Sequence, residues 1–170
     1  WKVVEAVARL ASEGSDVELL LVGGGTGRGQ RLLEDSIDKF DPKREFVTQL
    51  EYVDNNKIPD LLAEAQLFLF ASSCENMPIT LMEGMASGLP IVCSDRGPMP
   101  ETLKGGGVYF DPENPESIKN SILKVVNDDE LSAELSSKAF ELARQLTWER
   151  CAHETWSLIS QTAERLKTKS

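Results

Sequence analysis

The most informative stretch of this sequence is Glu75-Asn76-Met77-Pro78-Ile79-Thr80-Leu81-Met82-Glu83-Gly84-Met85-Ala86-Ser87-Gly88-Leu89-Pro90. It carries two carboxylates, Glu75 and Glu83, eight positions apart. An apolar run over residues 67–71 leads directly into it, and such a run is typical of a buried strand. We therefore expect Glu75 in the loop after a strand and Glu83 on the helix that follows.

The residues that flank this helix mark its limits. Asn76 is a good N-cap residue and Pro78 suits a first helical turn, so we expect the helix to begin there. Gly88 and Pro90 are of the types that commonly follow the end of a helix. The pattern predicts a helix over residues 78–87.

A helix that begins just after a strand favours the binding of an anion. The first-turn amides attract phosphate, and we expect Ile79 and Thr80 to supply them. Glu83 lies roughly 7–8 Å along the helix axis at about 1.5 Å per residue, which is about the length of a sugar ring. Glu83 is therefore placed for a ribose diol and Glu75 for the phosphate side, and the pair predicts a nucleotide sugar as the ligand.

The rest of the chain alternates between strands and helices. Strands are expected over residues 17–22, 46–50, 67–71, 90–94 and 107–110, and helices over 1–13, 28–39, 57–64, 78–87, 115–126, 129–145 and 148–166. Continuous apolar strands between amphipathic helices predict an α/β fold, a doubly wound, Rossmann-like parallel sheet with helices on both faces. Loops that follow the strands, at 23–25, 72–80 and 95–98, are expected to gather at one edge.

Composition excludes several classes of function. The chain has 170 residues, enough for one domain with a core, and its net charge of -10 argues against nucleic acid as a partner. It has no apolar run of about 18 residues, the length that spans a membrane. Cys74, Cys93 and Cys151 lack metal-ligand spacing, and Cys93 is expected in the core. The single histidine, His153, lies in a helix distant from Cys74, so no metal site or Cys–His nucleophile is expected.

Together, these residues resemble the signature of the retaining, family 4 glycosyltransferases of GT-B fold, E-G-F-G-L-x-x-x-E-A-M-A-x-G-x-P-V-V. The chain matches it from Glu75 to Val92, and Ser94-Asp95-Arg96-Gly97-Pro98-Met99-Pro100-Glu101 resembles the family's S-D-x-G-G-x-P-E. An isolated E-x7-E carries no weight, whereas its combination with the following motifs is highly specific. The resemblance covers nearly the whole chain, as the C-terminal, donor-binding half of such an enzyme.

The resemblance implies a set of donor contacts. Glu75 is the expected catalytic carboxylate that orients the sugar, and Glu83 holds the ribose. Gly23-Gly24-Gly25 matches a turn that approaches the nucleotide, and Tyr52 and Val53 match the loop that pairs with the base. The other implied contacts are Arg28, Ser73, Asn76, Met77, Pro78, Ile79 and Thr80.

The residues alone leave a structural alternative open for several of these contacts. The glycines can serve a tight turn only, and Arg28 and Glu83 can be solvated helix residues. Tyr52 can be a rim or core aromatic, and Glu75 an ordinary loop acid. The chain also departs from the family's G-F-G at Asn76-Met77-Pro78, where Pro78 removes one amide from the phosphate cradle.

The resemblance also sets the expected domain organisation. Residues 1–170 form the donor-binding domain, and the acceptor-binding N-terminal domain lies outside the sequence. In the expected strand order 3-2-1-4-5-6, the first and central strand is also absent, with the Arg and Lys that follow it, because residues 1–10 align with the next helix. The last helix is expected to cross to the other domain through Trp156 and Leu158.

The implied activity is transfer of a sugar, with retention, from a nucleoside diphosphate sugar to a hydroxyl acceptor. A UDP-sugar is the expected donor and enters as a substrate, so no cofactor is expected, and catalysis is mainly electrostatic. A non-catalytic nucleotide-binding scaffold domain and a GT-B nucleotide-sugar epimerase stay open as alternatives. The donor class and the cysteines suggest a cytoplasmic enzyme, with peripheral membrane association as a further expectation.

Overall fold

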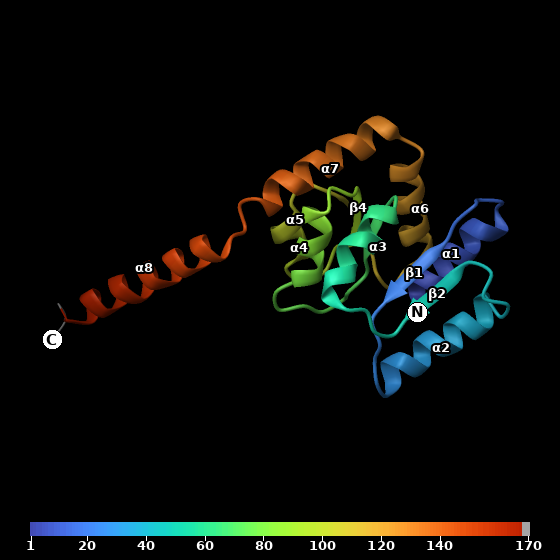
Figure 1. Ribbon diagram of the computed structural model, residues 1–170, viewed down its shortest axis with the longest axis horizontal. Coiled ribbons are helices and arrows are strands. Elements are labelled where there is room, and N and C mark those ends of the chain that lie inside the picture. The colour runs from blue at the N-terminus through green and yellow to red at the C-terminus, as the bar shows by residue number, and fades with distance from the viewer. Residues whose placement is uncertain (168–170) are drawn as a thin grey trace.

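Residues 1–167 are described by a computed structural model, in which parallel strands alternate with helices (Figure 1). The elements are α1 (Lys2–Ser12), β1 (Leu19–Val22), α2 (Arg28–Phe40), β2 (Val47–Leu50), the 3-10 helix η1 (Asn55–Lys57), α3 (Ile58–Glu64), β3 (Phe68–Phe70), α4 (Ile79–Ala86), β4 (Ile91–Ser94), α5 (Met99–Leu103), β5 (Val108–Phe110), α6 (Pro115–Val126), α7 (Asp129–Ala143) and α8 (Trp148–Lys167). The α/β class and the order of elements are confirmed. The short helix α5 was not predicted.

The strands form two parallel sheets rather than one. β1 pairs with β2 with Leu19 opposite Val47, and β4 lies between β3 and β5, with Phe68 opposite Ile91. The neighbours within each sheet follow the expected order 3-2-1-4-5-6 once its first strand is left out. The division falls between β1 and β3, which is the place of that strand.

Helix α1 packs against both sheets. Val3, Ala6, Val7 and Leu10 share one apolar cluster with Val92 of β4, and Leu19 of β1 and Leu69 of β3 pack against that cluster. On the same helix, Val4 lies in a second cluster with residues of α2 and β2. The helix therefore holds the two sheets together through apolar burial, the main favourable contribution to folding.

Ion pairs reinforce the contact between α1 and α6. Arg9 donates a hydrogen bond to Glu116 at 3.0 Å, and Lys119 donates one to Glu13 at 2.7 Å. Both carboxylates are about half exposed, so these pairs orient the helices more than they stabilise the fold.

At the division between the two sheets, the edge strands β1 and β3 each lack a strand partner on one side. The amides of Leu19 and Gly23 donate hydrogen bonds to the carbonyls of Phe46 and Leu50. The backbone groups of Leu20 and Val22 in β1 therefore point away from β2. In β3, Phe68 donates its amide to Pro90. By the same alternation, the backbone amide and carbonyl of Leu69 point away from β4. Leu20 and Val22 are also exposed, although a strand of four apolar residues is typical of a buried position in a parallel sheet.

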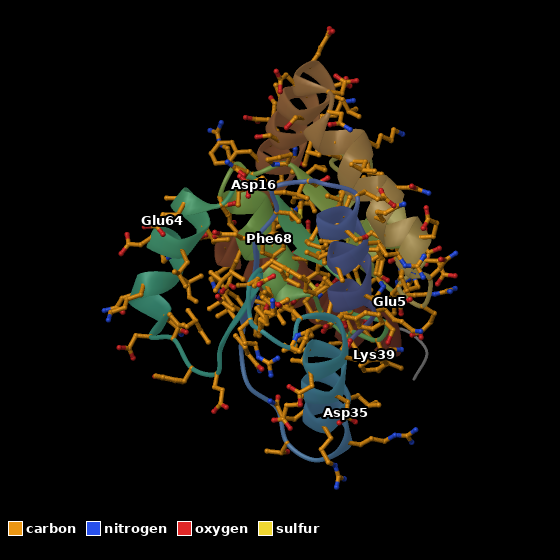
Figure 2. All side chains as sticks on the ribbon, turned by 90° about the vertical axis from the view of Figure 1, so that its right-hand side faces the viewer. Glu5, Asp16, Asp35, Lys39, Glu64 and Phe68 are labelled. Carbon is orange, nitrogen blue, oxygen red and sulfur yellow. The ribbon has the colours of Figure 1, made fainter. Side chains whose placement is uncertain are left out.

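Helix α4 is held against β3 by close packing. Leu81 and Met85 are fully buried, and Gly84 faces the ring of Phe68. Figure 2 shows Phe68 at the centre of the molecule and Asp35 and Glu64 at its periphery. This packing leaves Thr80 and Glu83 on the exposed face of the helix.

Helix α8 projects away from the rest of the molecule (Figure 1). Trp148 and Trp156 on this helix are 83% and 70% exposed, and Leu158 is exposed as well. Among the helices that the structure describes, none is long and apolar enough to cross a membrane.

We predict that Gly84→Ala destabilises the fold. The added methyl carbon would lie 2.5 Å from the Phe68 ring, which is closer than side-chain carbons approach each other. Overpacking of this kind costs about 1–3 kcal/mol in the free energy of unfolding, more than the helix gains from alanine. Urea denaturation measures this change. Gly105→Ala is the control, because nothing lies within 4 Å of its added carbon, and equal stability of both variants would contradict the packing described.

Candidate functional site

Loops from neighbouring strands contact each other at the carboxyl ends of the strands. The amide of Gly23, after β1, donates to Leu50 at the end of β2 at 2.8 Å, and the side chain of Gln49 donates to the Gly23 carbonyl at 3.3 Å. In the other sheet, Gly97 after β4 lies next to the Glu75 carbonyl oxygen of the loop after β3. The site is therefore built from two pairs of touching loops.

The glycine turn has two features that only small residues permit. Gly23 has a φ of 117°, which side chains rarely tolerate. A methyl carbon on Gly24 would lie 3.1 Å from the Glu51 carbonyl oxygen. The turn thus rests on the loop after β2, and Gly25 and Arg28 follow it as exposed residues at the start of α2.

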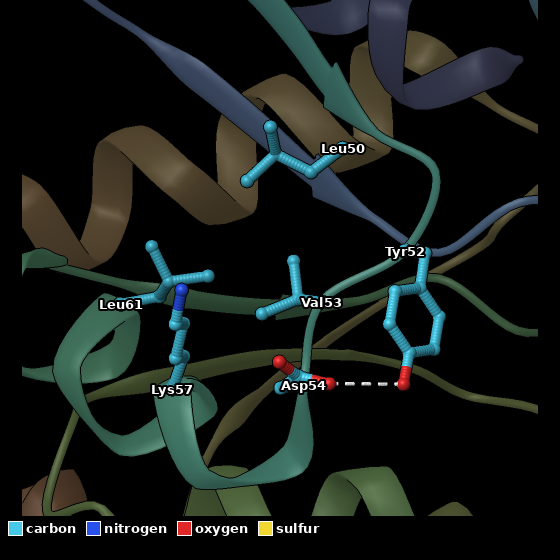
Figure 3. Close-up of a pocket in the computed structure, with 6 residues that line it drawn as sticks. All are labelled: Leu50, Tyr52, Val53, Asp54, Lys57 and Leu61. Carbon is cyan, nitrogen blue, oxygen red and sulfur yellow. Dashed lines mark hydrogen bonds between the residues drawn. The ribbon is translucent and has the colours of Figure 1, made fainter.

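A pocket of about 300 Å³ lies beside the end of β2 (Figure 3). It is lined by Leu50, Tyr52, Val53, Asp54, Lys57 and Leu61. Tyr52 is 81% exposed, and its hydroxyl donates a hydrogen bond to Asp54 at 3.0 Å. Of the alternatives left open for Tyr52, the structure excludes the core position and places it at the rim, while Val53 is half-buried in the wall.

The start of α4 differs from the expected cap. The helix begins at Ile79, Pro78 holds the cap position, and no side chain caps the helix. Asn76 is therefore not the N-cap. Pro78 has φ and ψ of −81° and 72°, the geometry of an inverse γ-turn, and it places Asn76 too far upstream to reach the first-turn amides.

The γ-turn also changes which amides are available. The Ile79 amide donates to the Met77 carbonyl at 2.9 Å, so it does not join Thr80 in an anion cradle as expected. Met82 donates to the Pro78 carbonyl at 3.1 Å. Within the described part of the chain, Thr80 and Leu81 are left as the first-turn amides without a backbone acceptor. The candidate anion site therefore lies one residue farther along than the sequence suggested.

The two carboxylates of the motif flank these amides. Glu75 is half-buried in the loop before α4, and Glu83 is exposed as the fifth residue of the helix. Over residues 1–167, neither side chain has a hydrogen-bonding or ion-pairing partner. Both are therefore able to accept hydrogen bonds from a ligand. Ser73, Asn76 and Met77 in the same loop are exposed.

An arginine that the sequence analysis did not single out follows β4. Arg96 pairs with Asp95 at 3.3 Å and with Asp111, after β5, at 2.9 Å. The backbone amide of Glu113 and the guanidinium of Arg96 hold the pKa of Asp111 below its usual range. These bonds fasten the loop that touches Glu75. Only the fold brings Arg96 and Asp111 together, so sequence spacing gave no signal for the pair.

Cys74 and Cys93 lie apart from His153, whereas Cys151 is two positions before it on α8. Cys93 is fully buried in β4, as expected, and burial raises the pKa of its thiol to about 12. Cys74 is exposed before Glu75, and His153 is on the projecting helix α8. In residues 1–167 no three His, Cys, Asp or Glu side chains are grouped so that they would hold a metal ion.

The fold defines an α/β domain with a candidate ligand site at the carboxyl ends of its parallel strands. The family described as "Glycosyl transferases group 1" matches residues 2–142. The chain therefore belongs to this family of glycosyltransferases.

Individual proteins agree with this assignment. Over 110 residues, which are 65% of this chain and 29% of that protein, the chain is 30% identical to the O-antigen chain mannosyltransferase B of Escherichia coli. The structure of Anabaena HepE in complex with UDP has a TM-score of 0.74 at 23% identity, over 98% of this chain and 44% of that chain. The C-terminal domain of the group 1 protein LpcC of Francisella tularensis has a TM-score of 0.72 at 19% identity, over 85% and 76% of the two chains.

We predict opposite effects of two glycine substitutions near the turn. Gly24→Ala forces the Glu51 carbonyl to move, at a cost of about 1 kcal/mol in the free energy of unfolding. Gly29→Ala meets nothing within 4 Å on helix α2 and is expected to gain about 0.5 kcal/mol. Thermal denaturation of both variants tests this, and a Gly24→Ala protein as stable as the Gly29→Ala protein would show that the two loops do not touch.

Proposed function

We propose that this chain is the donor-binding domain of a retaining glycosyltransferase. The complete enzyme transfers a sugar from a nucleoside diphosphate sugar, a UDP-sugar, to a hydroxyl acceptor. The observation that carries the proposal is the pair of unpartnered carboxylates, Glu75 and Glu83, on either side of the free amides of Thr80 and Leu81. Membership of the glycosyltransferase family supports it, as does the UDP complex of the HepE protein, which has a similar fold.

In this proposal each group binds one part of the donor. The amide and hydroxyl of the exposed Thr80 hold the diphosphate, and Arg28 approaches it from α2. Glu83 accepts hydrogen bonds from the ribose, and Glu75 orients the sugar. Gly23, Gly24 and Gly25 let the nucleotide approach the backbone closely.

Catalysis in this proposal is mainly electrostatic. The bond between the sugar and the diphosphate breaks, and the acceptor oxygen forms a bond on the same face of the sugar. The proton of the acceptor hydroxyl passes to the leaving diphosphate. The α4 amides stabilise the charge that develops on the diphosphate as it leaves. No protein nucleophile and no resident cofactor take part.

The donor class and the free cysteines support a cytoplasmic location, with the membrane surface as an alternative for the complete enzyme.

We also propose that one more parallel strand completes the sheet between β1 and β3. The free backbone groups of Leu20, Val22 and Leu69 support it, because they offer hydrogen bonds on both sides of that place. A strand there, followed by α1 and β1, forms a βαβ unit, which is right-handed in nearly all proteins. Residues preceding Trp1 supply this strand, and the acceptor-binding domain precedes it. The chain spans 29% of the length of the mannosyltransferase relative, which leaves room for both.

Hydrogen exchange tests the added strand. In residues 1–170 alone, we expect the amides of Leu20, Val22 and Leu69 to exchange rapidly, since they have no acceptor, while Leu21 and Phe70 are protected by β2 and β4. In a form extended at the N-terminus, all five are expected to be protected. If the extension leaves Leu20, Val22 and Leu69 as rapid as before, the proposed strand does not bind there.

The ribose role of Glu83 is tested by calorimetric titration of the full-length protein with UDP. Glu83→Gln is expected to weaken binding about tenfold, which corresponds to about 1.4 kcal/mol, because the amide is a weaker acceptor than the carboxylate. Glu130→Gln, at an exposed position of α7, is the matched control and is expected to bind as the unmodified protein does. Equal affinity of both variants would exclude Glu83 from the site. Nucleotide binding without any sugar transfer would favour a scaffold domain.

A further inference from the structure

The pocket beside β2 contains a cation without an acidic partner. Lys57 ends the 3-10 helix η1, and its backbone amide donates to the Asp54 carbonyl at 2.8 Å. Although the chain has a net charge of -10, the Lys57 ammonium forms no ion pair within the described residues. Figure 3 shows its side chain beside Leu61, on the wall of the pocket.

The nearest candidate for neutralising Lys57 is occupied elsewhere. Asp54 lies three positions before it, but the Asp54 carboxylate accepts the hydroxyl of Tyr52 on the opposite side of the pocket (Figure 3). The groups around Lys57 are mostly apolar, from Leu50, Val53 and Leu61. An ammonium offers three donors and no acceptor. Lys57 is exposed in the ligand-free chain. A ligand that fills this pocket covers the ammonium, and it then supplies an acceptor to Lys57 or leaves that donor unsatisfied.

We propose that Lys57 selects the class of nucleobase, favouring uracil and guanine, which carry an oxygen at C4 and C6 respectively, over cytosine and adenine, which carry an amino group there. The inference rests on the proposed function, in which a nucleotide donor occupies this edge of the sheet. The volume of about 300 Å³ is at the lower end of the range of small-ligand pockets, which suits one base rather than the whole donor.

The discrimination follows from the pairing of donors with acceptors. The exocyclic oxygen of uracil accepts a charge-assisted hydrogen bond from Lys57. The amino group of cytosine at the same position turns its own hydrogens toward the ammonium, so the charge-assisted hydrogen bond that uracil makes at this position is lost. A site with this property rejects the wrong ligand more strongly than an apolar pocket does.

UDP and CDP form the sharpest test, because they differ only at this edge of the base. The full-length protein is titrated with both nucleotides by calorimetry, and with GDP and ADP as the purine pair. We expect UDP to bind at least about tenfold more tightly than CDP, as one hydrogen bond to a charged group provides. Lys57→Met keeps the length of the side chain but removes the donors, and it is expected to bring the ratio of the two affinities close to one.

The control and the contradicting outcomes separate this inference from the proposed function. Lys124→Met, at an exposed position of α6, removes the same charge from the protein and is expected to keep the ratio. A ratio near one in the unmodified protein, or an unchanged ratio in Lys57→Met, would overturn the role of Lys57 while leaving nucleotide binding intact. Failure of the unmodified protein to bind any of the four nucleotides would instead overturn the proposed function, and this inference with it.

Discussion

The alternating hydrogen bonds of parallel strands are the constraint on which the rest of this structure depends. Every strand runs in the same direction as its sheet neighbours, so the loops that follow β1 and β2 meet each other, as do those that follow β3 and β4. The same alternation leaves free backbone groups on β1 and β3. Helix α1, packed on both sheets, keeps these two edges in one molecule. The position of the site and the division of the sheet thus have a common origin.

The proposed site would let an acidic protein bind an anion locally. With a net charge of -10, the chain as a whole repels polyanions, but local amides and a helix dipole act over a few ångströms. The γ-turn at Pro78 engages the Ile79 amide and leaves the amides of Thr80, which is exposed, and Leu81, which is buried, without a backbone acceptor. The carboxylates of Glu75 and Glu83 flank this turn in the sequence. Neither forms a hydrogen bond or an ion pair within the described residues that would stabilise the fold. In the proposed function, the donor supplies hydrogen-bond partners to both carboxylates.

Sequence patterns predicted the fold well and the fine geometry of the site less well. The apolar strands, the helices between them and the buried Cys93 follow from local patterns that tertiary contacts reinforce. The prediction of Asn76 as the cap was wrong because the turn at Pro78 makes the helix begin at Ile79. Capping propensities alone do not reveal such a turn. Helix α5, with five residues and a proline, is too short to show the hydrophobic periodicity by which a helix is predicted. Lys57 and Leu61 join Leu50 in a pocket only through folding, and the match of Gly84 to the Phe68 ring is likewise a contact between distant residues.

The central claim is that the loops at the carboxyl ends of the strands form one nucleotide site. Amide chemical-shift mapping by NMR during titration with UDP tests it most directly, because every loop reports separately. The account predicts shifts at Gly24, Val53, Thr80 and Leu81, and none at Gly105, which precedes β5 at the opposite edge. Shifts that gather around Gly105 and helix α7, or no shifts at millimolar UDP, would contradict it.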